Sequence, residues 1–252
     1  IKTVRSWDAI FSLINEKMKN NFFITIISLI ISCSKKQEIK LTKLIGSPEY
    51  SDSELKLSSL SGEYDFSFDI MNYNLGEQTK DAIEKGLANS VKGQHIHFIV
   101  NNDPYSAHYE PNFSKQLDND NNVILAFLSR SYHESVKNEN AYVLTQISND
   151  KSKEIDLTKQ FLFYSRPKGV YKGEDTKKLL LDFYLVNTDI SPNGNKVRLT
   201  VQEKEFIIDS WEPYILEGLA KGEVNLKLEL IDEKDNLIKT EFNPSYRKVI
   251  LE

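Results

Sequence analysis

Two histidines separated by one residue are the first side chains in this sequence that could bind a metal ion. His95 and His97 lie in residues 93–100, where apolar residues recur at every second position. This alternation predicts a β-strand, in which side chains two apart share a face at a spacing of about 6.5–7 Å. Two imidazoles at that spacing can reach one ion, and imidazole favours copper or zinc. The sequence therefore predicts half of a metal site.

The remaining ligands must come from elsewhere in the fold. The other two histidines, His108 and His133, are candidates, and so are the carboxylates of Glu110 and Glu134. The alternative is that the histidine pair forms only cross-strand contacts and hydrogen bonds, in a purely structural or interaction module.

Arginines beside hydroxyl groups form a second candidate site. Arg130 lies between two serines, and Arg166 and Lys168 lie in residues 164–169. A guanidinium group can hold a phosphate or carboxylate through two parallel hydrogen bonds. These residues predict an anion-binding or phosphopeptide-binding module as an alternative function. In the structural interpretation, the arginines pair with acids or brace neighbouring segments.

Neither catalysis nor nucleic-acid binding is expected. No serine lies in a Gly-x-Ser-x-Gly segment, and no glycine-rich loop matches a phosphate-binding or dinucleotide-binding fingerprint. The chain has 32 basic and 37 acidic side chains, a formal net charge of −5. Binding to nucleic acid needs clustered Lys and Arg, and the sequence has no such cluster. We therefore expect a binding protein that is not an enzyme.

An internal repeat predicts how the histidines are positioned. Residues 93–100 align with residues 194–201 at an offset of 101, and the same offset relates residues 123–127 to residues 224–228. In this alignment the apolar residues around the histidine pair match a buried set in the second copy. The two imidazoles should therefore point away from the core, toward solvent or a ligand.

The repeat also predicts the fold. Alternating strands punctuated by turn residues favour an all-β chain with two tandem immunoglobulin-like antiparallel β-sandwich domains. We place copy one at residues 54–150 and copy two at residues 151–252. Copy one carries an insertion, residues 76–92, in which residues 79–88 are predicted to be helical.

The N-terminal region resembles a bacterial lipoprotein signal. It has a basic start at Lys19, an apolar run and a lipobox-like segment that ends at Cys33. The resemblance implies cleavage before this cysteine and its acylation, for example with palmitate. The apolar run is too short for a hydrocarbon core of about 30 Å, which takes roughly 20 residues. Residues 1–17 then precede the true start of translation, residues 18–32 form the signal peptide, and residues 33–53 form a polar tether.

The same resemblance implies a place in the cell. Ser34, directly after the cysteine, resembles the sorting pattern of lipoproteins of the outer membrane of Gram-negative bacteria. The expected partners are the membrane, through the lipid, and an unknown ligand or envelope protein. The folded part would face the periplasm or the cell surface.

Several segments together resemble a group of uncharacterised tandem-sandwich lipoproteins of Gram-negative bacteria. The resemblance covers nearly the whole chain after the signal and rests on residues 88–90, 93–97, 103–105, 129–135 and 164–169. The His-x-His strand is also similar to one in a domain of unknown function from periplasmic proteins. The resemblance associates some members of the group with phosphopeptide binding. It implies no established reaction or ligand for the group as a whole.

Overall fold

The computed structural model describes residues 38–61, 64–150, 152 and 154–252. The expected upstream segment, the signal peptide and Cys33 lie outside the described residues. The chain divides into residues 1–38 and a second compact unit, residues 39–252. No helix of the described part is long and apolar enough to cross a membrane.

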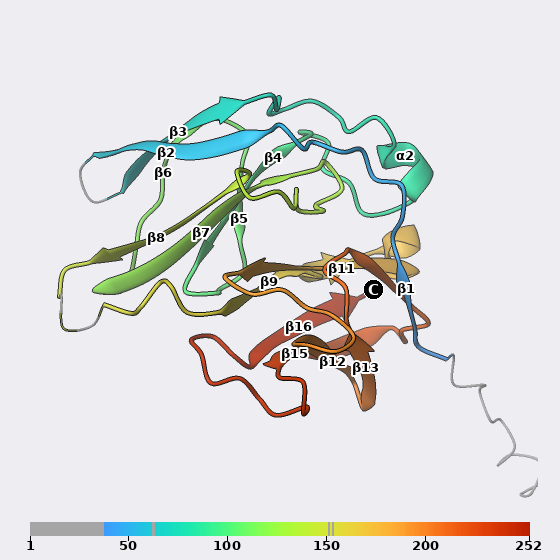
Figure 1. Cartoon of the computed structure of the whole chain (residues 1–252). Coiled ribbons are helices and arrows are strands. Elements are labelled where there is room, and N and C mark those ends of the chain that lie inside the picture. The colour runs from blue at the N-terminus through green and yellow to red at the C-terminus, as the bar shows by residue number, and fades with distance from the viewer. Residues whose placement is uncertain (1–37, 62–63, 151, 153) are drawn as a thin grey trace, which may run out of the picture. The chain divides into compact units, whose positions relative to one another are not determined.

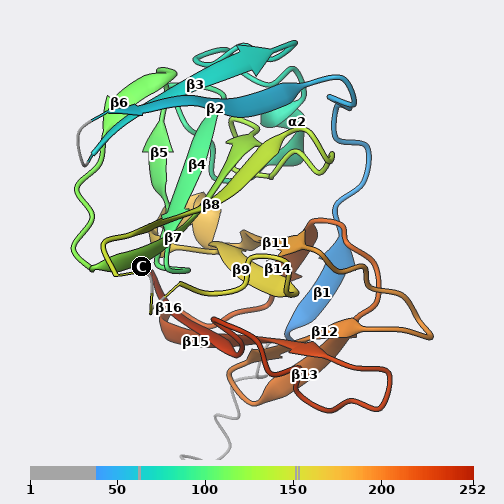
Figure 2. The same cartoon turned by 60° about the vertical axis from the view of Figure 1, so that its left-hand side comes forward.

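The second unit consists of two β-sandwiches, each made of two sheets (Figures 1 and 2). The sheets of the first sandwich contain, in spatial order, β2 (Glu54–Ser61), β3 (Asp65–Met71) and β6 (Asn112–Ser114), and then β5 (Ser106–His108), β4 (His95–Val100), β7 (Asn121–Ser129) and β8 (Tyr142–Ser148). The sheets of the second sandwich contain β1 (Lys40–Lys43), β14 (Tyr214–Glu217), β11 (Lys178–Val186) and β9 (Phe161–Arg166), and then β10 (Gly169–Tyr171), β16 (Ser245–Leu251), β15 (Gly222–Ile231), β12 (Lys196–Val201) and β13 (Lys204–Ile208). The pairing is antiparallel except between β10 and β16. The predicted all-β, immunoglobulin-like sandwich fold is confirmed.

Each sandwich has its own core because its strands alternate. In the first sandwich Phe66 and Phe68 of β3 face Ile96 and Phe98 of β4. The core of the second sandwich contains the alternating apolar residues of β11, β12 and β15. Burying one face of each strand in this way is the arrangement that a period of two predicts.

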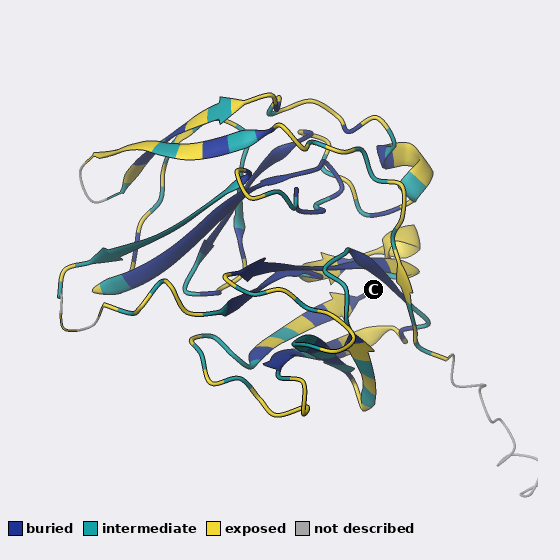
Figure 3. Cartoon of the chain, viewed as in Figure 1, coloured by how far each residue is buried: buried dark blue, intermediate teal, exposed yellow. Residues whose placement is uncertain are grey.

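A third cluster of buried residues joins the two sandwiches. It combines Phe127 and its neighbours on β4 and β7 with Phe163 of β9 and Tyr184 of β11. Strands β7, β9 and β11 are therefore buried on both faces, as their continuous dark colour in Figure 3 shows. The sheet that contains the histidine pair lies against a sheet of the second sandwich.

Matched positions of the two sandwiches adopt the same unusual backbone conformation. Asn72 and Asn187, aligned in the repeat, have φ angles of 54° and 55°. Asn101 and Gln202, related by the offset of 101, have φ angles of 50° and 54°. Residues other than glycine rarely adopt positive φ, so the agreement shows that equivalent turns recur in both units.

The predicted offset of 101 is wrong for strands β7 and β15. Ile96 pairs with Leu128, whereas the equivalent Val197 pairs with Leu230, and this pairing requires an offset of 102. A slip of one residue exchanges the two faces of a strand. Val123, Leu125 and Phe127 consequently face the second sandwich, while their predicted counterparts on β15 face their own core.

Two local predictions are also corrected. The expected tether, residues 33–53, includes strand β1, which pairs with β14 over Lys40–Lys43. The Ser47 hydroxyl donates to Glu134 at 2.5 Å, so this segment contacts the first sandwich as well. The helix expected at residues 79–88 is the shorter α2 (Ala82–Lys85), which ends at Gly86 with φ 59°. A short 3₁₀ helix, η2 (Gly173–Thr176), precedes β11.

Candidate metal centre

Strand β4 places His95 and His97 on the face that points away from the core of the first sandwich. The intervening apolar residues lie in that core, as the repeat predicts. The sequence left solvent or a ligand as the surroundings of the imidazoles, and solvent is excluded because both residues are 0% exposed. The second sandwich covers this face of the sheet and turns an outward strand face into an interior one.

A third histidine completes a compact cluster. The Nε2 atoms of His95 and His97 are 2.9 Å apart, and Nδ1 of His133 lies 3.1 Å from Nε2 of His95. One ligand nitrogen from each of the three residues lies within 4.8 Å of the other two. No aspartate or glutamate of the described chain belongs to this group. We name these three residues the histidine cluster.

His133 reaches the cluster because of a turn that both sandwiches share. The Arg130 N–H donates to the Glu134 carbonyl, and His133 has a φ of 71°. In the second sandwich Asp235, 102 residues later, has a φ of 63° in the equivalent turn. The left-handed conformation is therefore a feature of the turn in both sandwiches, and only the first sandwich places a histidine there.

The hydrogen bonds of His95 fix its tautomer. Its Nδ1 atom lies 2.8 Å from the carbonyl oxygen of Gly93, which can only accept, so Nδ1 carries the proton. The neutral ring then has one lone pair, on Nε2, directed toward the other two histidines. His97 also has a partner at Nδ1, the Ser165 hydroxyl at 3.2 Å, which can either donate or accept. A partner on the remote ring nitrogen is typical of histidines that bind metals.

The cluster is neutral because it is buried. The pKa of His95 falls to about 4, mainly because the ring is buried. The hydrogen bond to the Gly93 carbonyl opposes this fall, and the charges of Arg166 and Lys168 contribute to it. Burial and the neighbouring histidines lower the pKa of His97 well below its usual value. For His133, burial and then Arg166 lower the pKa strongly. At neutral pH all three rings therefore keep a nitrogen lone pair, which metal coordination requires.

The three ligand nitrogens lie close enough for a small transition-metal ion to draw them together. Zinc bonds to imidazole nitrogen are about 2.0–2.1 Å, so tetrahedral ligands are separated by about 3.3–3.4 Å. The two separations from His95, 2.9 and 3.1 Å, would need to open by roughly 0.2–0.5 Å. The third separation, between His97 and His133, reaches 4.8 Å and would need to close by roughly 1.4 Å. Three histidines leave one tetrahedral position for a further ligand. Copper also accepts imidazole ligands in several geometries.

The structure places the other candidate ligands elsewhere. His108 of β5 pairs with Ile96 and so lies on the opposite face of the sheet. Its Nε2 atom is 2.8 Å from the Ser106 hydroxyl. Glu134 forms an ion pair with Arg130 at 2.9 Å.

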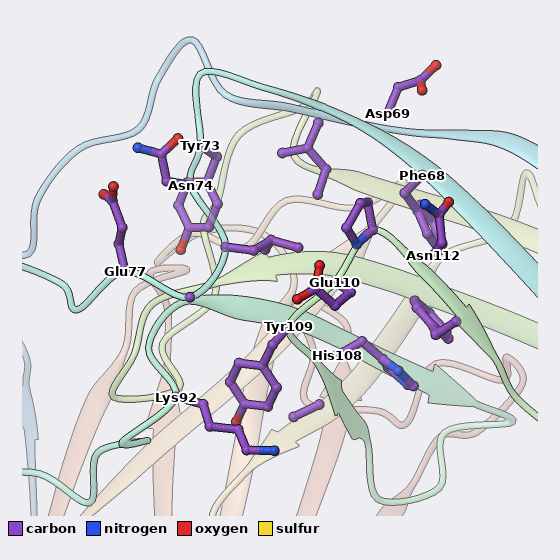
Figure 4. A pocket seen from close by; sticks show the side chains of 16 residues that line it. Phe68, Asp69, Tyr73, Asn74, Glu77, Lys92, His108, Tyr109, Glu110 and Asn112 are labelled. Atoms are coloured by element: carbon purple, nitrogen blue, oxygen red, sulfur yellow. The ribbon is translucent and has the colours of Figure 1, made fainter.

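His108 and Glu110 instead line an open pocket of about 1160 Å³ between β3, β5 and β6. Figure 4 shows them beside Tyr109 and Lys92. Neither residue belongs to the histidine cluster.

The predicted cationic residues separate into two groups. Arg130 is 6% exposed and holds Glu134, the Ser135 carbonyl and the Pro48 carbonyl, so it braces the N-terminal segment against the first sandwich. Arg166 and Lys168 lie near the histidine cluster, on the side of the second sandwich. The sequence did not predict that these two cations lie beside the histidines.

Three further residues around the cluster were missed. Tyr105 stacks on His97 with ring centroids 3.5 Å apart, and its hydroxyl lies 3.2 Å from Nδ1 of His133. Ser129 places its hydroxyl 3.2 Å from Nε2 of His97. Ser165 is the partner from the second sandwich. All three residues lie in segments on which the family resemblance rests, and this was the signal in the sequence that could have identified them.

Comparisons with known proteins identify only remote similarity. No family model and no curated protein matches this chain. The fibronectin(III)-like modules of Clostridium thermocellum CbhA are 11% identical over 85% of this chain and 94% of that chain, with a TM-score of 0.29. The two tandem V-type regions of VCBP3, a chitin-binding protein, are 7% identical over 85% of this chain and 99% of that chain, with a TM-score of 0.24.

A third solved structure is Bacteroides ovatus SGBP-B, from a mixed-linkage glucan utilization locus, in complex with a heptasaccharide. It is 8% identical over 63% of this chain and 61% of that chain, with a TM-score of 0.17. Similarities at this level carry no argument about function. The chain is therefore described by its fold, a tandem β-sandwich protein, and by its histidine cluster.

Proposed function

We propose that this protein is a non-enzymatic lipoprotein of the bacterial envelope that binds a copper or zinc ion through its histidine cluster. One observation carries the metal proposal. Nε2 of His95 has a single lone pair, yet two imidazole nitrogens lie within 3.1 Å of it. One lone pair accepts only one strong hydrogen bond, whereas a metal ion would satisfy all three rings together.

The surroundings support the same conclusion. The hydrogen bonds at Nδ1 of His95 and His97 orient the rings with Nε2 toward the common centre. The three ligands come from a rigid strand and from a turn whose geometry recurs in the second sandwich. A purely structural role needs neither three clustered ring nitrogens nor a histidine in that turn.

The test is metal binding by the full chain and by a His133→Asn variant. Asparagine tolerates positive φ, so the turn should persist while one ligand is lost. Wild type should bind one zinc or copper ion in competition titrations and metal analysis. The variant should lose more than the 10–100-fold in affinity that removal of a second-shell partner typically costs.

The matched control is Asp235→Asn, in the equivalent turn of the second sandwich, which should bind metal like wild type. Absence of stoichiometric zinc and copper in wild type would refute the proposal. Equal affinities of wild type and the His133→Asn variant would refute this choice of ligands.

The envelope location rests on the lipobox-like segment and is tested separately. Cys33→Ser, expressed in a Gram-negative host, should lose labelling by radioactive palmitate and leave the membrane fraction. The His133→Asn variant serves as the control, because it should keep both the label and the location. Undiminished labelling of the Cys33→Ser variant would contradict acylation at this residue.

A further inference from the structure

Arg166 is a buried cation without a carboxylate partner. It is 6% exposed, and its Nε atom is buried without a hydrogen-bond partner. Its guanidinium lies 5.9 and 5.7 Å from the ring centroids of Tyr105 and Tyr171. Asp182, which faces it across strands β9 and β11, is held by Lys137 at 2.6 Å and by Ser135. No salt bridge joins Arg166 to any acid in the described part of the chain.

A second cation lies beside Arg166. The Lys168 ammonium group donates to the Tyr105 carbonyl at 2.5 Å and lies 3.9 Å from the centroid of the Tyr105 ring. Burial and then the charge of Arg166 lower the pKa of Lys168 to about 8. Tyr105 touches the histidine cluster through His97 and His133, so both cations lie next to the candidate metal centre.

This arrangement creates an imbalance of charge when a metal ion binds. Three neutral imidazoles neutralise none of the charge of a divalent ion, and no acidic side chain of the described residues belongs to the cluster. Two protein cations already act on the same histidines. Uncompensated charge in a buried site is costly, so a negatively charged group should accompany the metal.

We propose that the histidine cluster binds its metal together with a small oxyanion, a carboxylate or a phosphate, which takes the open metal position and pairs with Arg166 and Lys168. This inference rests on the proposed metal site and deepens it by naming the class of ligand. Guanidinium is suited to the role, because its fork of donors matches the oxygens of both anions.

The test measures zinc affinity of the full chain in a non-coordinating buffer, with and without acetate or inorganic phosphate. Either anion should raise the apparent zinc affinity within the roughly 5–150-fold range typical of coupling between sites. By reciprocity, zinc should raise the affinity for the same anion by the same factor. The two anions in separate arms show whether a carboxylate or a phosphate fits better.

An Arg166→Met variant separates this inference from a folding defect. Removing the buried charge should increase zinc affinity in the absence of anion and abolish most of the anion effect. A misfolded variant would lose both. Arg198→Met is the matched control, because Arg198 occupies the repeat position of His97 in the second sandwich, and it should behave like wild type.

The outcomes distinguish the two proposals. No zinc or copper binding in any buffer refutes the metal site itself. Zinc binding that is unaffected by acetate and phosphate leaves the metal site standing and refutes the anion. An anion effect of equal size in wild type and the Arg166→Met variant refutes the role of Arg166.

Discussion

His108 shows how differently a histidine behaves outside the cluster. Its ring stacks on Phe113 with centroids 3.4 Å apart, and it lies near Phe98 on the core side of β5. Burial, and then the charges of Lys115 and His95, lower its pKa to about 4. The ring is neutral at pH 7 and resists protonation in the folded state.

This lowered pKa predicts an acid-dependent loss of stability. Below pH about 6.5 the unfolded chain binds a proton at His108 that the folded chain does not, so the free energy of unfolding falls as the pH falls. The loss should continue down to pH about 4 and then cease for this residue. Urea denaturation at a series of pH values, with a chelator present, measures it.

A His108→Asn variant should show a shallower decline over the same range, since it lacks the titrating ring. An unchanged slope would contradict the assignment. The chelator keeps metal binding to the histidine cluster out of the comparison.

The sequence predicted part of the site at this scale. The alternation around Ile96 correctly assigned His95 and His97 to one face of a strand. His133 could not be assigned, because its position depends on a turn whose equivalence to that of Asp235 appears only at an offset of 102. The contributions of Ser165 and Arg166 depend on contacts between sandwiches, which local patterns do not contain.

At the scale of elements, strand β7 determines how the two sandwiches meet. Phe127 is 0% exposed and packs between His97, at 5.1 Å, and Tyr184, at 4.7 Å between ring centroids. The unbroken apolar run of residues 123–128 is typical of a strand covered on both faces. This apolar run indicated burial on both faces. The assumed offset of 101, however, assigned Val123, Leu125 and Phe127 to the core of the first sandwich, whereas they face the second sandwich.

Two-sided burial predicts a large effect of Phe127→Ala. Loss of a fully buried phenylalanine typically costs about 3–5 kcal/mol of unfolding free energy, and urea denaturation measures it. Ile207→Ala on β13, where the side chain is 52% exposed, is the control and should change stability by about 1 kcal/mol or less. A cost for Phe127→Ala as small as that of the control would mean that solvent covers this face.

At the scale of the whole unit, the fold class was predictable and the assembly was not. Alternation and turn residues suffice to indicate sandwiches, because each strand encodes which of its faces is apolar. The packing of one sandwich on another depends on which outer faces are complementary, as β7 is to β9 and β11. The histidine cluster lies at this junction, so its burial and cationic surroundings escaped prediction.

The pairing of β1 with β14 limits how far a lipid could stand from the protein. If Cys33 is acylated as proposed, seven residue steps separate the acyl chain from Lys40, the first residue of β1. A fully extended chain gains at most about 3.6 Å per residue, so the acylated residue and Lys40 can be at most about 25 Å apart. The β-sandwiches would then lie within about 25 Å of the lipid headgroups. A ligand or partner protein would have to approach them through this space or from the side.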